Sequence, residues 1–177
     1  MQYLHKRRIE TDCWLLEDGN MKVVGELDDD KGIPFQAYSK HIPSGGDLHT
    51  LRVTLLVSSE LVIKEAQIEM LDVPGEFCVE IEPMAERLIG IAVAKGYVRA
   101  INERLGGVKS CNHIVSLLQS MGPAIIQAYY SIQGLKSIEN GGWLRLMNTC
   151  HVFREDGPLI DRIRKEQENK PSSEEKA

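Results

Sequence analysis

The sequence contains no apolar run long enough to cross a bilayer. Its longest apolar stretches, residues 88–94 and 121–128, are interrupted by glycine or by Gly122-Pro123, and both are much shorter than the ~20 residues of a transmembrane helix. A basic cluster at residues 6–8 is not followed by an apolar segment, so the N-terminus does not have the pattern of a signal peptide. We therefore expect a cytoplasmic protein with no membrane partner.

An excess of positive charge is also missing, as are the common catalytic motifs. The chain has 21 Lys+Arg against 26 Asp+Glu, a net charge of -5, which argues against nucleic acid as a partner. The sequence contains no phosphate-binding loop, dinucleotide-binding fingerprint, His-Glu-x-x-His zinc motif or Gly-x-Ser-x-Gly nucleophile elbow. Its function must therefore be inferred from residues that are dispersed along the chain.

Paired Cys-x-x-Cys spacing, the strongest sequence signal for zinc, is absent too. Four cysteines, Cys13, Cys78, Cys111 and Cys150, are spread widely, and a reducing cytoplasm would keep them as thiols rather than disulfides. Cys13 lies in an alternating strand pattern, where a free cysteine is usually a small core residue. The other three remain candidates for a functional site.

Hydrophobic periodicity predicts an α+β fold that begins with two antiparallel β-hairpins forming a sheet. Residues 8–16 and 21–27 alternate around an Asp-Gly-Asn turn, and residues 51–57 and 61–71 alternate around a second turn. The stretch between the hairpins, residues 28–47, is rich in Asp, Gly, Pro and Ser and is expected to be a long loop that includes a solvated acidic run.

A packed helical half is predicted to follow the sheet. Short helices are expected after Cys78 and over residues 98–105, and one long helix from Cys111 to about Ile132, where apolar residues recur at three- and four-residue spacing. Pro123 removes an amide donor within this helix, so it should kink the helix or divide it in two. A last amphipathic segment should begin at residues 156–158.

The length and composition indicate a single domain. A chain of 177 residues with 42% hydrophobic residues is enough for one core. We assign residues 1–164 to this α+β domain. Residues 165–177 contain Glu, Lys and Ser but no large apolar side chain, which predicts a disordered charged tail.

The chemistry is concentrated around Cys111 and His113 at the expected start of the long helix. A thiol in the first helical turn faces unpaired backbone amides and the positive end of the helix dipole, which favour the thiolate needed for metal ligation or nucleophilic attack. Ser110 is a plausible N-cap, and Lys109 adds positive charge. On an ideal helix, Cys-x-His spacing places the two side chains about 200° apart, so they converge only if the first turn is irregular.

Three further elements carry ligands suited to the same ion. His49 lies at the mouth of the second hairpin, Cys78 at the junction of strands and helices, and Cys150-His151 near the end of the chain. Thiolate and imidazole favour zinc, iron or an iron–sulfur cluster over magnesium or calcium. The predicted metal site comprises His49, Cys78, Cys111, His113, Cys150 and His151.

Two other hypotheses are compatible with these residues. Cys111 could be the nucleophile of a thiol-dependent enzyme, with His113 or His151 as its base. The chain could instead be a non-catalytic ligand-binding or interaction module, in which the apolar face of the second hairpin and the long helix form a pocket or a homodimer surface.

The ordered landmarks also resemble a known family. These are residues 7–10, 48–53, 150–153 and 156–158, and above all the Glu-Arg-Leu-Gly-Gly-Val-x-x-Cys-x-His motif over residues 103–113. Together they resemble, over nearly the whole chain except the tail, a bacterial family catalogued only as a domain of unknown function, which implies no particular reaction.

A looser likeness is to iron–sulfur cluster assembly scaffolds, in which antiparallel strands lead into helices. These scaffolds place cysteines at a strand-to-helix junction and at a later helix start, and Cys78 and Cys111 fall at comparable places. The glycine-cysteine-glycine loop of the scaffolds is absent around Cys78. The likeness implies a cluster or zinc site.

Overall fold

The structure is a computed structural model, and it describes residues 1–139, 144 and 146–168. The chain divides into two compact units, Met1–Tyr129 and Tyr130–Ala177, with the division falling inside the long helix. The first unit carries the sheet and the helices packed on it. Each unit is described by itself below.

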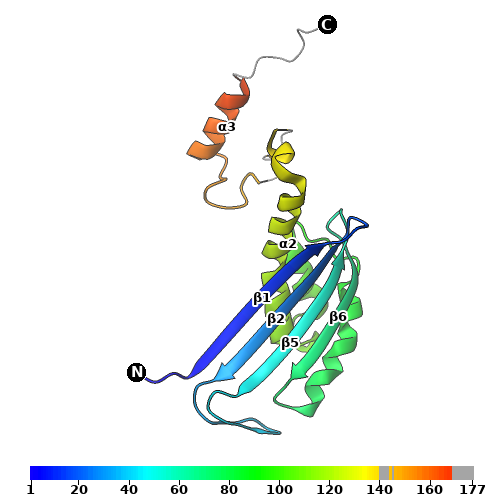
Figure 1. Ribbon diagram of the computed structural model, residues 1–177, viewed down its shortest axis with the longest axis vertical. Coiled ribbons are helices and arrows are strands. Elements are labelled where there is room, and N and C mark those ends of the chain that lie inside the picture. Colours follow the sequence, from blue (N-terminus) through cyan, green and yellow to red (C-terminus); the bar gives the residue numbers. More distant parts are fainter. Residues whose placement is uncertain (140–143, 145, 169–177) are drawn as a thin grey trace. The chain divides into compact units, whose positions relative to one another are not determined.

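The first unit is built on a four-stranded antiparallel sheet. Its strands are β1 (His5–Leu15), β2 (Met21–Lys31), β5 (Asp47–Val57) and β6 (Ile63–Asp72), and their order in the sheet is β1-β2-β5-β6 (Figure 1). All neighbouring strands pair antiparallel. The predicted α+β class and the prediction of two hairpins that form a sheet are confirmed.

The predicted long loop over residues 28–47 is wrong in part. Strand β2 continues to Lys31, and two short strands, β3 (Phe35–Gln36) and β4 (His41–Ile42), pair as a small separate hairpin. Strand β2 is longer than predicted because buried and more exposed residues alternate along it, so that one residue in two faces the core even where the sequence is acidic. Three buried apolar residues hold the small hairpin, Ala37, Ile42 and Leu48.

Helices follow the sheet in the order that the periodicity predicts. A 3-10 helix, η1 (Glu76–Leu88), leads to α1 (Tyr97–Leu105), a short turn η2 (Gly107–Lys109) and the long helix α2 (Asn112–Glu139). Helix α2 continues through Pro123 as one element, so the proline does not divide it.

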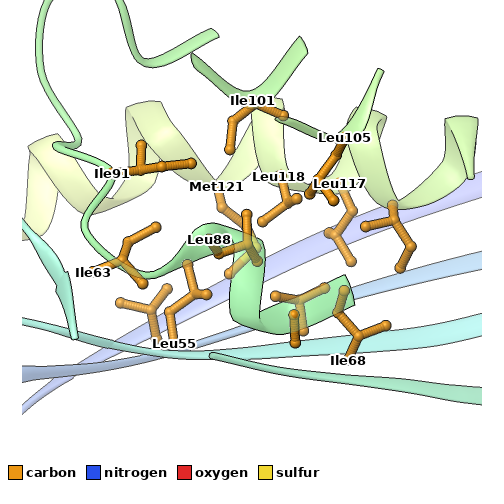
Figure 2. Close-up of a cluster of buried hydrophobic side chains, with 14 of the residues drawn as sticks. Leu55, Ile63, Ile68, Leu88, Ile91, Ile101, Leu105, Leu117, Leu118 and Met121 are labelled. Carbon is orange, nitrogen blue, oxygen red and sulfur yellow. The ribbon is translucent and has the colours of Figure 1, made fainter. Parts of the chain in front are cut away.

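The core lies between the inner face of the sheet and these helices. Side chains from β5, β6, η1, α1 and α2 meet there (Figure 2), and they include Leu55, Ile68, Leu88, Ile101, Leu117, Leu118 and Met121. The inner face of the second hairpin and the apolar stripe of α2 are therefore buried within one chain. These side chains are core residues of the first unit, and the interaction-module hypothesis stays a prediction.

A glycine in β2 allows α2 to lie unusually close to the sheet. A Cβ atom at Gly25 would lie 2.6 Å from Sδ of Met121 and 3.1 Å from Cδ1 of Leu117. From Met121 back to His113, the helix rises about 12 Å. From Gly25 to Asp29, the strand extends about 13 Å. The close contact at Gly25 therefore brings the first turn of α2 over the Asp29 end of β2.

The second unit contains helix α3 (Pro158–Glu168), at the predicted amphipathic segment. Residues 165–168 of the predicted tail are helical, and residues 169–177 lie outside the described residues. The disordered tail and the single domain over residues 1–164 stay predictions. None of the described helices has both the length and the apolar character required to span a bilayer.

Candidate metal centre

A row of polar side chains crosses the sheet at the end where α2 begins. Arg7 on β1 is the register partner of Asp29 on β2, and Asp29 is in turn the register partner of His49 on β5. Asp29 is 1% exposed and His49 is 8% exposed. Burying a carboxylate is costly unless other groups pair with its charge, so the surroundings of Asp29 determine the chemistry of this region.

Four basic side chains surround the Asp29 carboxylate. Arg7 donates from Nε to Oδ1 and from a terminal guanidinium nitrogen to Oδ2, both at 2.7 Å. His5 Nε2 lies 3.3 Å from Oδ1. Nδ1 of His49 and Nε2 of His113 lie 3.3 and 3.6 Å from Oδ2. One carboxylate therefore gathers side chains from β1, β5 and α2.

These contacts fix the ionisation of the carboxylate. Burial alone raises the pKa of Asp29, but the hydrogen bonds and charge of Arg7, together with the charges of His113 and His5, lower it further than burial raises it. The net pKa of Asp29 lies below its ordinary value. The same hydrogen bonds raise the pKa of Arg7, so the pair is fully charged at neutral pH.

The start of α2 delivers His113 to this carboxylate and places Cys111 behind it. The carbonyl of Cys111 accepts the N–H of Val115 at 3.1 Å, and Cys111 Sγ accepts the N–H of His113 at 3.3 Å. These two bonds make Cys111 the N-cap, and the prediction that Ser110 caps the helix is wrong. Because Cys111 lies outside the helix, the 200° separation does not apply, and its Sγ is 3.2 Å from Nδ1 of His113.

The two histidines at the site lie against each other. The ring centroids of His49 and His113 are 3.9 Å apart with a 33° tilt. Burial, followed by the charge of His113, lowers the pKa of His49 to about 4. Burial and the charge of Arg7 also lower the pKa of His113. Both imidazoles are therefore neutral at pH 7.

One buried nitrogen at the site has an unused hydrogen-bonding capacity. Nδ1 of His49 is buried and has no well-aligned hydrogen bond from the described residues, although Oδ2 of Asp29 lies 3.3 Å away and acts to raise the pKa of the imidazole against the effect of burial. Leaving such a nitrogen unsatisfied costs about 1–3 kcal/mol. The arrangement is that expected of a nitrogen that serves as a ligand.

Three side chains converge closely enough to share an ion. Asp29, His49 and His113 each offer a ligand atom, and these atoms all lie within 4.8 Å of one another. A metal ligand must present a lone pair, as the neutral imidazoles and the ionised carboxylate do here. The remaining ring nitrogen of His113 faces Cys111, and metal-binding histidines usually have such a partner on their second nitrogen.

The structure gathers only some of the residues that the sequence predicts as ligands. His49 and His113 belong to the converging group, and Cys111 contacts the far side of the His113 ring without being a member. Cys78 lies in η1, where its Sγ is 3.6 Å from the hydroxyl of Tyr38, and it is not a member either.

Cys150 and His151 belong to the second unit, and both are exposed. His151 lies beside Arg154, with 3.3 Å between His151 Nε2 and the guanidinium. Neither residue is in the converging group. Their role as ligands stays a prediction.

Sequence analysis missed the acidic member of the converging group, Asp29, and its ion-pair partner. Asp29 falls within an acidic run that suggests a solvated loop, yet the alternation of Val23, Gly25 and Leu27 continues into it and places Asp29 on the core face. The same alternation along β1 places Arg7 opposite Asp29. An inward-facing carboxylate in a strand was the signal that could have revealed the site.

The chain was compared with protein families, curated proteins and solved structures. The sequence model of a family described as "Protein of unknown function (DUF2889)" matches residues 5–127, which is 123 of 177 residues. No curated protein and no solved structure matches the chain. The matched segment contains Asp29, His49, Cys111 and His113, whereas the Cys150-His151 pair lies outside it.

Proposed function

The chain belongs to the family described as protein of unknown function (DUF2889), and from its own side chains we propose that it is a metal-binding protein. Asp29, His49 and His113 hold one divalent transition-metal ion, zinc or iron. The observation that carries the proposal is the buried Nδ1 of His49, which has no hydrogen bond from the described residues and lies 3.3 Å from Oδ2 of Asp29.

The donor set favours zinc or iron over magnesium or calcium. Imidazole nitrogen suits zinc, iron, copper and nickel, whereas magnesium and calcium prefer an environment made of oxygen atoms. Two histidines and one carboxylate occur both at catalytic zinc sites and at non-haem iron(II) sites. Three protein ligands leave at least one coordination position for water or a substrate oxygen, which makes Lewis-acid or hydrolytic chemistry available.

The surrounding residues support this assignment. Arg7 uses one lone pair on each Asp29 oxygen, and a carboxylate has about four acceptor directions. Oδ2 therefore keeps a lone pair for an ion while Arg7 fixes the orientation of the group. Cys111 does the same for the ring of His113, by contact with its Nδ1.

Elemental analysis tests the proposal. Protein purified without an affinity tag should contain about one equivalent of zinc or iron, and His49→Ala and His113→Ala should each lose it. His41→Ala is the matched control, because His41 is an exposed histidine on β4, and it should keep the metal. Wild-type protein that is folded but takes up neither zinc nor iron(II) would overturn the proposal, as would undiminished binding by both site variants.

A second candidate function is a thiol-dependent enzyme with Cys111 as its nucleophile. Cys111 Sγ lies 3.2 Å from Nδ1 of His113, and Nε2 of the same ring lies 3.6 Å from Asp29. This is the thiol–imidazole–carboxylate order of a nucleophilic triad. The two functions compete for Nε2 of His113, so one chain in one state performs only one of them.

Alkylation of metal-free protein distinguishes these functions. If Cys111 is a nucleophile, iodoacetamide should modify it well before Cys13, and His113→Ala should slow that modification at least about tenfold. If the metal function holds, Cys111→Ala should keep the ion but bind it about 10- to 100-fold more weakly, as expected for a residue that supports a ligand.

A further inference from the structure

The outer edge of β1 is a long, regular strand edge without a partner in the described part of the chain. One edge of β1 pairs with β2 along all 11 residues, and no described strand pairs with the other. The β1–β2 pairing has no register shift, whereas the β2–β5 and β5–β6 pairings each have shifts. At about 3.3 Å per residue, β1 offers roughly 36 Å of free backbone donors and acceptors.

Folded proteins usually protect such an edge with proline, a bulge or charged side chains, because another strand can add to it, and β1 does carry charges, among them the inward-facing Arg7. Strand β1 contains no proline, and its pairing shows no bulge. Its charges follow a definite order instead. On the face opposite Arg7 the sequence runs Lys6, Arg8, Glu10, Asp12, with both positive residues before both negative residues.

We infer that β1 pairs antiparallel with β1 of a second copy of this chain, with Ile9 opposite the partner's Ile9. In this register Lys6 lies opposite the partner's Asp12, and Arg8 lies opposite the partner's Glu10. Two-fold symmetry repeats both pairs, so four oppositely charged pairs line one face of the interface. Oppositely charged cross-strand pairs are favourable and like charges directly opposite are not.

Exposed apolar side chains at the two ends of the strand fit the same register. Tyr3 and Leu4 are 53% and 56% exposed, and Trp14 and Leu15 are 48% and 58% exposed. With Ile9 on the two-fold axis, Leu4 meets the partner's Trp14 and Tyr3 meets the partner's Leu15. Aromatic and aliphatic cross-strand neighbours stabilise the pairing of strands, and the interface would cover apolar surface at both ends of β1.

Neighbouring registers do not have this complementarity. Moving the two-fold axis to residue 10 sets Glu10 against the partner's Glu10, and moving it to residue 8 sets Arg8 against the partner's Arg8. A shift of the two-fold axis by one residue along the strand therefore creates a like-charge contact at the centre of the interface. The order of the charges selects both a second copy of this chain and a single alignment.

The test uses Lys6 and Asp12, because Arg8 already forms an ion pair with Asp30 within the chain at 3.0 Å. Asp12 lies opposite Val24 and Lys6 lies opposite Asp30, so Asp12→Lys is the variant without a charged register partner in its own chain. Both test residues are exposed, and they lie on the opposite face of the sheet from Arg7. Lys6→Glu and Asp12→Lys therefore leave the proposed metal ligands and their ion pair unaltered.

Sedimentation velocity of the full chain should show a wild-type dimer that dissociates on dilution. Lys6→Glu or Asp12→Lys turns two favourable pairs per dimer into repulsive ones and should raise the dimer dissociation constant about 10- to 100-fold. An equimolar mixture of the two variants pairs every introduced charge with an opposite one. The mixture should form a heterodimer with nearly wild-type affinity.

Matched controls distinguish the effect of a charge change on β1 from the effect of a change in net charge. Lys95→Glu and Glu60→Lys make the same charge changes at exposed loop positions and should leave the dimer unchanged, and circular dichroism should show every variant folded. A monomeric wild type overturns the inference. So does a dimer that resists both edge variants, or a variant mixture that stays monomeric.

Discussion

Protonation of His49 should make the metal-free protein lose stability in a defined pH range. The pKa of this imidazole is lowered from 6.5 to about 4 in the folded chain, whereas the unfolded chain should titrate at about 6.5. Between these values the unfolded state binds more protons than the folded state, so the free energy of unfolding falls as the pH falls.

The size of the effect follows from the same two pKa values. At 1.36 kcal/mol per pKa unit, His49 should cost the folded state about 2 kcal/mol at pH 5 and about 3 kcal/mol at pH 4, relative to pH 7.5. His113, whose pKa is also lowered, acts with the same sign. The lowered pKa of Asp29 takes effect only below about pH 4, where its carboxylate begins to bind protons.

Urea unfolding in the presence of a chelator measures this linkage. His49→Asn should have the shallower dependence on pH, so that the difference in unfolding free energy between variant and wild type shifts by about 2 kcal/mol from pH 7.5 to pH 5. His41→Asn removes an exposed histidine and should follow the wild-type curve. Parallel curves for wild type and His49→Asn would refute the claim that His49 is buried in its neutral form.

Two packing predictions concern the helices that position the site. Gly25→Ala should lower the free energy of unfolding by urea by about 1–3 kcal/mol through overpacking, because the added Cβ would lie 2.6 Å from Sδ of Met121. Gly25→Ala should cost less in a Met121→Ala background. Equal costs in both backgrounds would contradict the close approach of α2 to β2. Tyr97→Phe should cost about 1 kcal/mol, because the buried Tyr97 hydroxyl donates to the carbonyl of Leu118 at 2.9 Å; an unchanged urea midpoint would contradict it.

The sheet and the long helix could be predicted because their apolar residues repeat with the period of the element. In residues 51–57 an apolar side chain occupies every second position, and the stripe that includes Leu117 and Met121 recurs every three or four residues. The small β3–β4 hairpin has neither signal, since two-residue strands are too short to show a period. Their pairing is fixed by contacts that only the folded chain brings together.

The candidate site was predictable in its histidines but not in its carboxylate. His49 and His113 attract attention because imidazole is rare in this chain and both lie at ends of elements. Asp29 is one of three consecutive aspartates, and residue type alone cannot separate it from its neighbours. Only the strand register shows that Asp29 faces inward while Asp28 and Asp30 do not.

Cys78 and Cys111 show that residue type alone does not determine which side chains converge. Each cysteine could ligate zinc or iron, but the hydrogen bond that makes Cys111 an N-cap turns its sulfur towards Nδ1 of His113. Cys78 instead faces the hydroxyl of Tyr38. These orientations depend on helix capping and on a hairpin that the periodicity did not predict.

The two-residue period of β1 gives its two faces different roles. Odd-numbered residues such as Arg7 point to the core side, and Arg7 pairs with Asp29, whereas even-numbered residues such as Lys6 and Asp12 carry the charges that we propose select a partner strand. A slip of one residue between β1 and β2 would exchange these sets, moving Arg7 away from the carboxylate and placing Lys6 over the core. Because Asp29 is buried and its charge requires Arg7, the ion pair at the site also fixes the register that exposes the charge pattern at the edge.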